Sequence, residues 1–191
     1  AAPALVALGG GGTLVVSIAA GTPLSAFEAI FGTGTPVVRA MPNTPAAIGR
    51  GISALVGNAA AGEGDLARAE ALMAAVGETV RLESESQMDA VTGLSGSGPA
   101  YVFHLIEAMA AAGEAEGLAP DLAMRLARAT VCGAGALARR SEDSAERLRV
   151  NVTSPGGTTA AGLEVLMAEL PDLMRRTVAA AAARGRALSG G

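Results

Sequence analysis

The hydrophobic pattern of this 191-residue chain changes near residues 82–86, and this change constrains the fold most. Before it, short apolar runs rich in β-branched residues and bounded by glycine alternate with amphipathic segments. That pattern predicts buried strands with covering helices. After it, only helical periodicity remains. The sequence therefore predicts an α/β part with a partial parallel sheet at residues 1–84, followed by an all-α part at residues 85–191.

Prolines and glycines indicate where the expected helices and strands begin and end. Pro99 is placed for the first turn of a helix, and Gly117 follows a helix end. The expected strands cover residues 13–19, 37–40, 51–57 and 78–82, and the helices between them cover residues 23–31 and 65–76. The helices of the all-α part are expected at residues 85–91, 99–116, 121–140, 144–150, 158–170 and 172–188.

Composition excludes several kinds of chemistry. The formal net charge is −4, so we expect no basic face and no nucleic-acid partner. All 14 basic residues are arginines, which excludes a catalytic lysine Schiff base. The single cysteine, Cys132, excludes an intrachain disulfide and a Cys-based zinc site, and the single histidine, His104, excludes a His cluster, so we expect no metal. We interpret both as structural residues of helices.

The uncharged segment at residues 1–27 raises the question of a membrane span. Glycines at 9–12 and Pro23 interrupt it, and it lacks the basic start of a secretory signal. We therefore expect no membrane partner and a reducing, cytoplasmic location. Because the chain begins with Ala rather than Met, we also expect it to be a piece of a longer protein.

Residues 151–163, N-V-T-S-P-G-G-T-T-A-A-G-L, separate two predicted helices. Free backbone N–H groups and the positive end of the helix dipole meet where a helix begins, which suits an anion. Ser154, Thr158 and Thr159 add hydroxyls. The stretch is therefore either a small carboxylate-binding corner or a plain turn that joins two helices.

Three further segments could take part in a site. Residues 92–99, T-G-L-S-G-S-G-P, form either one wall of a ligand cavity or a tight helix crossing, because glycines allow close approach. Residues 17–21 end one predicted strand and residues 41–45 follow another, at the positions where ligands of open α/β sheets bind. Hydroxyls, helix ends and strand-end loops suit a reaction whose hard step belongs to a cofactor, such as hydride transfer, rather than hydrolysis.

Four stretches resemble the pyrroline-5-carboxylate reductase family: V-V-S-I-A-A-G at 15–21, R-A-M-P-N-T-P at 39–45, D-A-V-T-G-L-S-G-S-G-P-A-Y at 89–101, and the stretch at 151–163. The resemblance covers essentially the whole chain. It implies the C-terminal part of a Rossmann NAD(P)-binding domain at residues 1–84 and an all-helical substrate and dimerisation domain at residues 85–191. The implied reaction is the NADPH- or NADH-dependent reduction of 1-pyrroline-5-carboxylate to L-proline, by a homodimer or higher homo-oligomer.

The resemblance also implies residue roles. Ser154, Thr158 and Thr159 would hold the substrate carboxylate, and Glu85 would be a further substrate contact. Thr92 would place a hydroxyl beside the imine nitrogen, where it orients the ring or relays a proton. Cofactor contacts are implied for Ile18, Ala19, Ala20, Pro42, Asn43 and Asn151.

The chain departs from the family pattern at its beginning. The family's first strand, its Gly-rich fingerprint and the residues that choose between NADPH and NADH are missing, and the glycine run at 9–12 opens no predicted helix. We therefore expect these 191 residues alone to bind cofactor poorly and to turn over little or nothing. The alternative is a helical dimerisation or ligand-binding module that performs no chemistry. A hydroxy-acid reductase is disfavoured because those enzymes usually rely on a catalytic lysine.

Overall fold

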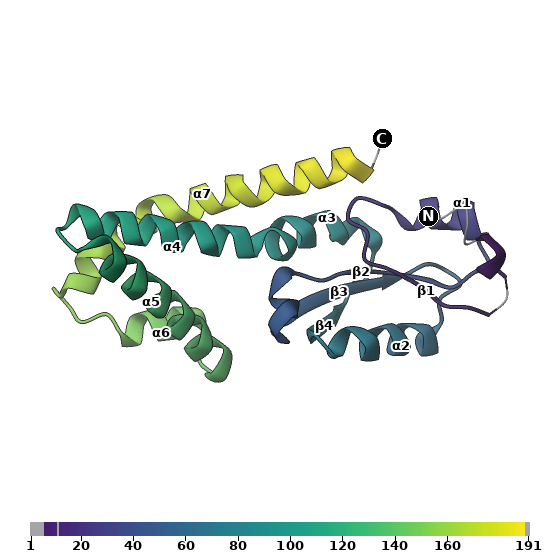
Figure 1. The fold of residues 1–191 in the computed structure, drawn as a ribbon, viewed down its shortest axis with the longest axis horizontal. Coiled ribbons are helices and arrows are strands. Elements are labelled where there is room, and N and C mark those ends of the chain that lie inside the picture. Colours follow the sequence, from purple (N-terminus) through teal and green to yellow (C-terminus); the bar gives the residue numbers. More distant parts are fainter. Residues whose placement is uncertain (1–5, 11, 190–191) are drawn as a thin grey trace. The chain divides into compact units, whose positions relative to one another are not determined.

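The computed structural model describes residues 6–10 and 12–189 (Figure 1). Two compact units make up the fold. The sheet unit holds the chain up to Pro99 together with the segment from Arg176 onwards, and the helical unit is Ala100–Arg175. Compared with the ranges expected from the sequence, residues 85–99 and the C-terminal segment belong to the unit that contains the sheet.

The sheet unit is built on four strands in the order β1–β2–β3–β4. These are β1 (Val15–Ser17), β2 (Val37–Met41), β3 (Gly51–Gly57) and β4 (Gly77–Arg81). β1 pairs parallel with β2 across α1 (Leu24–Phe31), and β3 pairs parallel with β4 across α2 (Glu63–Ala74). The predicted fold class, a partial α/β sheet followed by a helical domain, is confirmed.

The sheet differs from the prediction in one detail, because β2 and β3 pair antiparallel. Residues 42–50 join these strands and contain only the short 3₁₀ helix η2 (Thr44–Ile48). A parallel neighbour needs a crossover of about a dozen residues or more, so this short connection can only reverse the chain. The sheet is therefore mixed.

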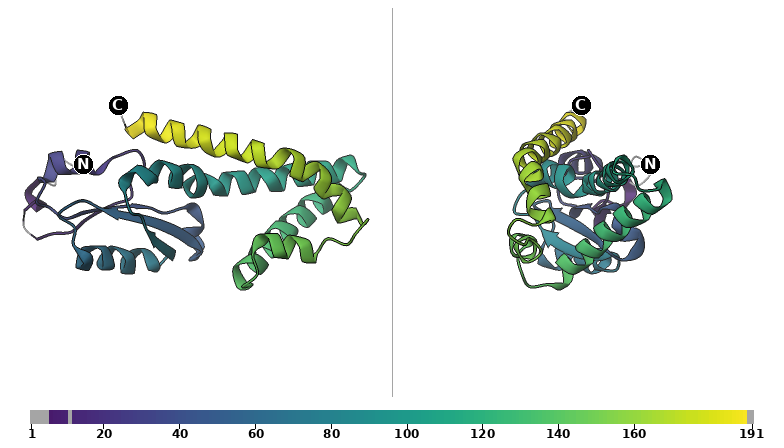
Figure 2. Two further views of the ribbon diagram at one scale, coloured as in Figure 1. Left: turned by 180° about the vertical axis from the view of Figure 1, so that it is seen from behind. Right: turned by 90° about the vertical axis from the view of Figure 1, so that its left-hand side faces the viewer.

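Successive residues of β2 point to opposite faces of the sheet, and a hydrophobic cluster covers each face. One cluster consists of Leu24, Val37, Val56 and Met88. The other consists of Val38, Ala40, Leu55 and Ala69. Accordingly, α2 lies on one face of the sheet, and α1 and α3 (Met88–Val91) lie on the other (Figure 2).

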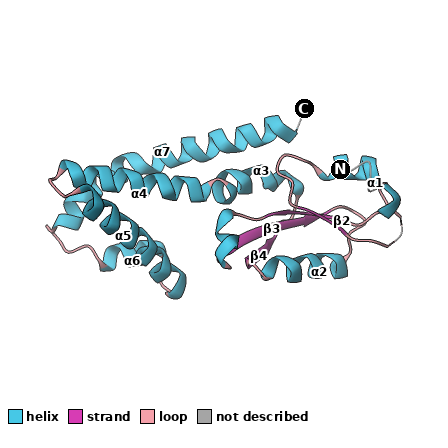
Figure 3. Cartoon of the chain, viewed as in Figure 1, coloured by secondary structure: helices cyan, strands magenta, loops and turns pink. Residues whose placement is uncertain are grey.

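Residues 85–96 form three consecutive short helical elements (Figure 3). They are the 3₁₀ turn η3 (Glu85–Gln87), then α3, then the π-helical turn η4 (Thr92–Gly96). The hydroxyl of Ser84 caps the first of these by accepting a hydrogen bond from the Ser86 N–H at 3.2 Å. Met88 is almost completely buried and anchors this segment to the sheet.

The helical unit contains most of α4 (Gly98–Ala115), all of α5 (Pro120–Arg140) and α6 (Ala145–Asn151), and the first half of α7 (Thr158–Ser189). Among its described residues, the buried cluster consists of three alanines, Ala110, Ala123 and Ala127. Large apolar side chains on the same helices stay exposed; Phe103 is 59% exposed and Leu126 is 49% exposed. The unit therefore leaves extensive apolar surface uncovered, which is typical of an interaction face.

α7 runs unbroken through Pro171, where the sequence predicted two helices. A proline removes one helical hydrogen bond and crowds the preceding turn, so it often ends or kinks a helix. Here Pro171 and Met167 are both exposed, and water can reach the Met167 carbonyl that loses its helical donor. No helix in the described part of the chain has the length and apolar character that membrane crossing requires.

A surface ion-pair cluster joins α2 to β4. Arg81 lies 2.7 Å from carboxylate oxygens of both Glu63 and Glu70. The hydrogen bond from Arg81 lowers the pKa of the Glu70 carboxyl below its ordinary value. Exposed pairs of this kind contribute little to stability. Glu63 therefore provides a surface glutamate for comparison with Glu85, which is described below.

Candidate functional site

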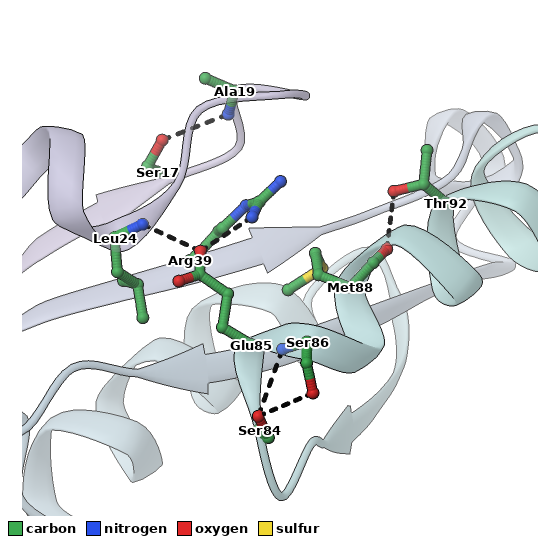
Figure 4. Close-up of polar contacts among 9 residues, drawn as sticks. All are labelled: Ser17, Ala19, Leu24, Arg39, Ser84, Glu85, Ser86, Met88 and Thr92. Carbon is green, nitrogen blue, oxygen red and sulfur yellow. Dashed lines mark hydrogen bonds and ion pairs between the residues drawn. The ribbon is translucent and has the colours of Figure 1, made fainter. Parts of the chain in front are cut away.

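Two loops extend beyond the carboxyl ends of the parallel strands β1 and β2. Residues 18–20 follow β1 and are exposed, and Pro42 and Asn43 follow β2 and are half-buried. The Ala19 N–H donates to Ser17 Oγ at 3.2 Å, which ties the first loop to its strand (Figure 4). Since parallel neighbours end at the same sheet edge, both loops lie where α/β sheets bind ligands.

Glu85 joins three segments of the sheet unit. Its Oε1 accepts a hydrogen bond from Arg39 Nη1 in β2 and another from the Leu24 N–H at the start of α1, each at 2.8 Å (Figure 4). Arg39 is only 4% exposed, so its cation is buried beside this carboxylate. The sequence predicted Glu85 as a substrate contact. In the structure, its Oε1 already accepts hydrogen bonds from two protein donors.

Asn43 connects the loop after β2 to two neighbouring segments. Its Oδ1 accepts from the Ile52 N–H of β3 at 3.0 Å, and its Nδ2 donates to the carbonyl and hydroxyl oxygens of Ser95 at 3.4 Å. Gly96 packs closely on β2, because a Cβ at this position would lie 2.6 Å from Met41 Cε. The π-helical turn is therefore held against the end of β2.

Thr92 begins this π-helical turn. Its hydroxyl donates to the Met88 carbonyl at 2.8 Å, which leaves lone pairs of the oxygen able to accept a bond from a ligand (Figure 4). The next residue, Gly93, lies against the last turns of α7, where a Cβ would be 2.8 Å from the Val178 carbonyl oxygen and 3.0 Å from the Ala182 nitrogen. π-Helical turns are frequent at functional sites.

The turn between α6 and α7 lies in the helical unit and collects hydrogen-bond donors. Gly156 has φ +69°, a left-handed conformation that glycine adopts without strain. The exposed hydroxyls of Ser154, Thr158 and Thr159 form no hydrogen bond within the described part of the chain. The same holds for the N–H groups of the first three residues of α7. These donors at the positive end of a 32-residue helix match a carboxylate.

The predicted site residues form two groups. Within the sheet unit, Asn43, Glu85 and Thr92 lie on segments that contact β2, while residues 18–20 lie at the end of neighbouring β1. Within the helical unit, Asn151 ends α6, and Ser154, Thr158 and Thr159 follow it around one turn. Described residues contain no group of three or more His, Cys, Asp or Glu side chains placed to hold a metal ion.

Sequence reasoning missed one residue of the sheet unit, Arg39. The sequence did contain an indication that Arg39 is important, because it is the one charged residue in the apolar run 37–41 of a predicted buried strand. A buried arginine needs a carboxylate partner. The partner lies 46 residues further along the chain, so the sequence pattern alone did not identify it.

Comparison with known proteins places these features in a family context. A family model described as pyrroline-5-carboxylate reductase dimerisation matches residues 85–188. The pyrroline-5-carboxylate reductase of Pseudomonas aeruginosa is 48% identical over 155 residues, which cover 81% of this chain and 57% of that protein. The corresponding Arabidopsis thaliana protein is 43% identical over 177 residues, which cover 92% of this chain and 63% of that protein.

Two solved structures are also similar. The pyrroline-5-carboxylate reductase of Coxiella burnetii matches with a TM-score of 0.94 and 37% identity, covering 98% of this chain and 70% of that one. The Plasmodium falciparum pyrroline carboxylate reductase, solved with NADP bound, matches with a TM-score of 0.81 and 30% identity, covering 93% of this chain and 68% of that one. The chain thus spans about three fifths of the length of the curated relatives it matches.

Proposed function

The chain belongs to the pyrroline-5-carboxylate reductase family, and on this premise we propose that it reduces 1-pyrroline-5-carboxylate to L-proline with NADPH or NADH. The observation that carries the proposal is the donor-rich turn before α7, whose free hydroxyls and N–H groups suit the carboxylate of a cyclic imino acid. The resemblance noted in the sequence motifs agrees with this family membership.

The proposed roles follow the two groups of residues. Ser154, Thr158 and Thr159 bind the substrate carboxylate, and the Thr92 oxygen accepts a hydrogen bond from the ring nitrogen in its protonated form. A protonated imine is the better hydride acceptor because it carries positive charge. Orienting the substrate for reaction is the main contribution that positioning residues of this kind make.

The sheet unit fits the nicotinamide part of a cofactor. The small, exposed residues Ala19 and Ala20 at the end of β1 allow a flat ring to approach the backbone, and Pro42 and Asn43 adjoin them at the next strand. Ile18 and Asn151 remain predicted cofactor contacts, and Glu85 remains a predicted substrate-side residue. When bound, the cofactor supplies the hydride. The 191 residues contain no G-x-G-x-x-G turn for its pyrophosphate, so we expect this chain alone to bind it weakly.

A fusion enzyme tests the proposal. The segment of the Coxiella burnetii chain that precedes the matched region, which we expect to carry the Gly-rich turn, is placed ahead of residue 1, because the matched regions share one fold with a TM-score of 0.94. Oxidation of NADPH is followed with 1-pyrroline-5-carboxylate as substrate, and proline is quantified in the product. The added segment alone and the 191-residue chain alone are the controls.

We also propose that the chain forms a homodimer through the exposed apolar faces of its helical unit. The family model that matches residues 85–188 carries a dimerisation description, and the uncovered Phe103 and Leu126 are the kind of residues an obligate interface buries. A cytoplasmic location and the absence of nucleic-acid partners stay predictions from composition.

Replacing Leu126 with aspartate should convert the dimer to a monomer, because a dimer interface would have to desolvate the new charge. Sedimentation velocity of the wild-type chain and of the variant measures this change. Leu72→Asp is the matched control, since Leu72 is similarly exposed (58%) but lies on α2 of the sheet unit. If Leu126→Asp sediments as the wild type does, α5 does not form the interface.

A further inference from the structure

We propose that Glu85 and Arg39 form a positioning pair, which holds the loop at residues 18–23 and the segment that leads to Thr92 in a fixed relation to β2. The inference rests on the proposed function for its catalytic meaning. It adds to that function a role for Glu85: with Arg39 as its partner, Glu85 holds in place the loop after β1 that is proposed to contact the cofactor.

The start of α1 depends on Glu85 for a hydrogen-bond acceptor. Pro23 precedes the helix, and its side chain cannot accept a hydrogen bond from the first helical N–H groups. The Leu24 N–H therefore has no capping acceptor from the neighbouring residue. Glu85 Oε1 accepts from this N–H at 2.8 Å. A carboxylate at a helix N-terminus is also favoured by the helix dipole. Glu85 therefore fixes the residue at which the loop 18–23 ends.

Arg39 holds the carboxylate in place from the opposite side. Its Nη1 donates to the same Oε1 atom at 2.8 Å, and its side chain is 5% exposed, whereas that of Glu85 is 30% exposed. A buried cation without a partner is costly, so Arg39 restricts the positions that Glu85 can take. Since Arg39 lies beside Ser17 in the register of the sheet, the pair is anchored directly next to the strand from which the loop emerges.

The same glutamate opens the segment that carries Thr92. Glu85 begins η3, Met88 follows in the core, and Thr92 is bonded to the Met88 carbonyl. One carboxylate thus links the loop proposed for the cofactor to the turn proposed for the substrate nitrogen. Because its Oε1 bonds to two protein donors, this oxygen of Glu85 has a positioning role within the protein.

Amide hydrogen exchange of the 191-residue chain tests this inference without requiring any reductase activity. In Glu85→Ala, the amide of Leu24 should exchange roughly 10- to 150-fold faster, the range expected when a hydrogen bond to a charged group is lost, and the Ala19 amide at the start of the loop should also exchange faster. Protection at Leu55 in β3 should change far less. Glu63→Ala, which removes a surface glutamate paired with Arg81, should leave the loop unchanged. Glu85→Gln keeps an acceptor oxygen and should give a smaller, selective increase of roughly threefold to tenfold.

A selective increase at the amides of Ala19 and Leu24, which is smaller in Glu85→Gln than in Glu85→Ala, supports the pair as a positioning device. An unchanged loop, or an equal increase at every amide including Leu55, overturns it. If Glu85→Ala does not fold, Glu85→Gln decides by the same criterion. In the fusion enzyme, Glu85→Gln should raise the KM for NADPH several-fold and alter the KM for 1-pyrroline-5-carboxylate less than about twofold, whereas the reverse pattern would favour direct substrate contact. An inactive fusion would count against the proposed function alone, since the exchange measurement still decides the positioning role.

Discussion

Replacing Thr159 with valine should weaken binding of L-proline roughly 10- to 150-fold, which corresponds to the loss of a hydrogen bond to a charged group. Valine keeps the shape and the β-branch of threonine but removes the hydroxyl, which no described protein group uses. The helix start should therefore remain intact while one carboxylate donor is lost. Calorimetric titration of the fusion enzyme with L-proline measures the effect, and the KM for 1-pyrroline-5-carboxylate should rise in parallel.

Two comparisons make this result specific to the carboxylate. Thr79→Val makes the same chemical change on β4, outside the helical unit, and should leave proline affinity unchanged. Prolinamide, which lacks the carboxylate charge, should bind weakly to the wild type and be insensitive to Thr159→Val. An unchanged affinity for proline in Thr159→Val would remove Thr159 from the proposed site.

Replacing Gly93 with alanine should destabilise the sheet unit by about 1–3 kcal/mol, the usual cost of overpacking a well-packed site. The new Cβ would meet the Val178 carbonyl oxygen at 2.8 Å and the Ala182 nitrogen at 3.0 Å. Both are backbone atoms of a helix, so no side-chain rotation can relieve the clash, and the end of α7 must move from the π-helical turn. Thermal unfolding should show a decrease in Tm of about 2–4 °C for each kcal/mol.

The same substitution should impair catalysis in the fusion enzyme, because Thr92 adjoins the residue that is displaced. Gly64→Ala is the matched control: Gly64 is exposed on α2 and a Cβ there meets no atom within 4 Å. That change should leave the Tm equal or slightly higher, since alanine favours helix over glycine. A Gly93→Ala protein with wild-type Tm and kcat would show that close packing at this turn is unimportant.

Local patterns were sufficient to predict most elements of the fold. The β-branched runs around Val37–Met41 and Gly51–Gly57 became strands, and Pro99 and Pro120 lie in the first turns of α4 and α5. The start of α7 at Thr158 was also predictable, because Pro155 and two glycines end the preceding helical pattern. These features depend on neighbours within a few residues, and sequence periodicity reports such neighbours directly.

Features that depend on residues far apart in the sequence could not be predicted from local patterns. β2 and β3 pair antiparallel, and the apolar pattern of one strand does not record the direction of the strand beside it. The contact of Arg39 with Glu85 spans 46 residues and became evident only in the fold. The unbroken passage of α7 through Pro171 depends on the exposure of the preceding turn, which a local helix-breaking rule does not consider.

The most direct test of the proposed function is the formation of L-proline from 1-pyrroline-5-carboxylate and NADPH by the fusion enzyme. We predict one proline formed for each NADPH oxidised, with activity lost in the added segment alone and strongly reduced in Thr159→Val. Absence of NADPH oxidation above background, in a folded fusion that binds NADPH, would contradict the assignment of reductase function to this chain.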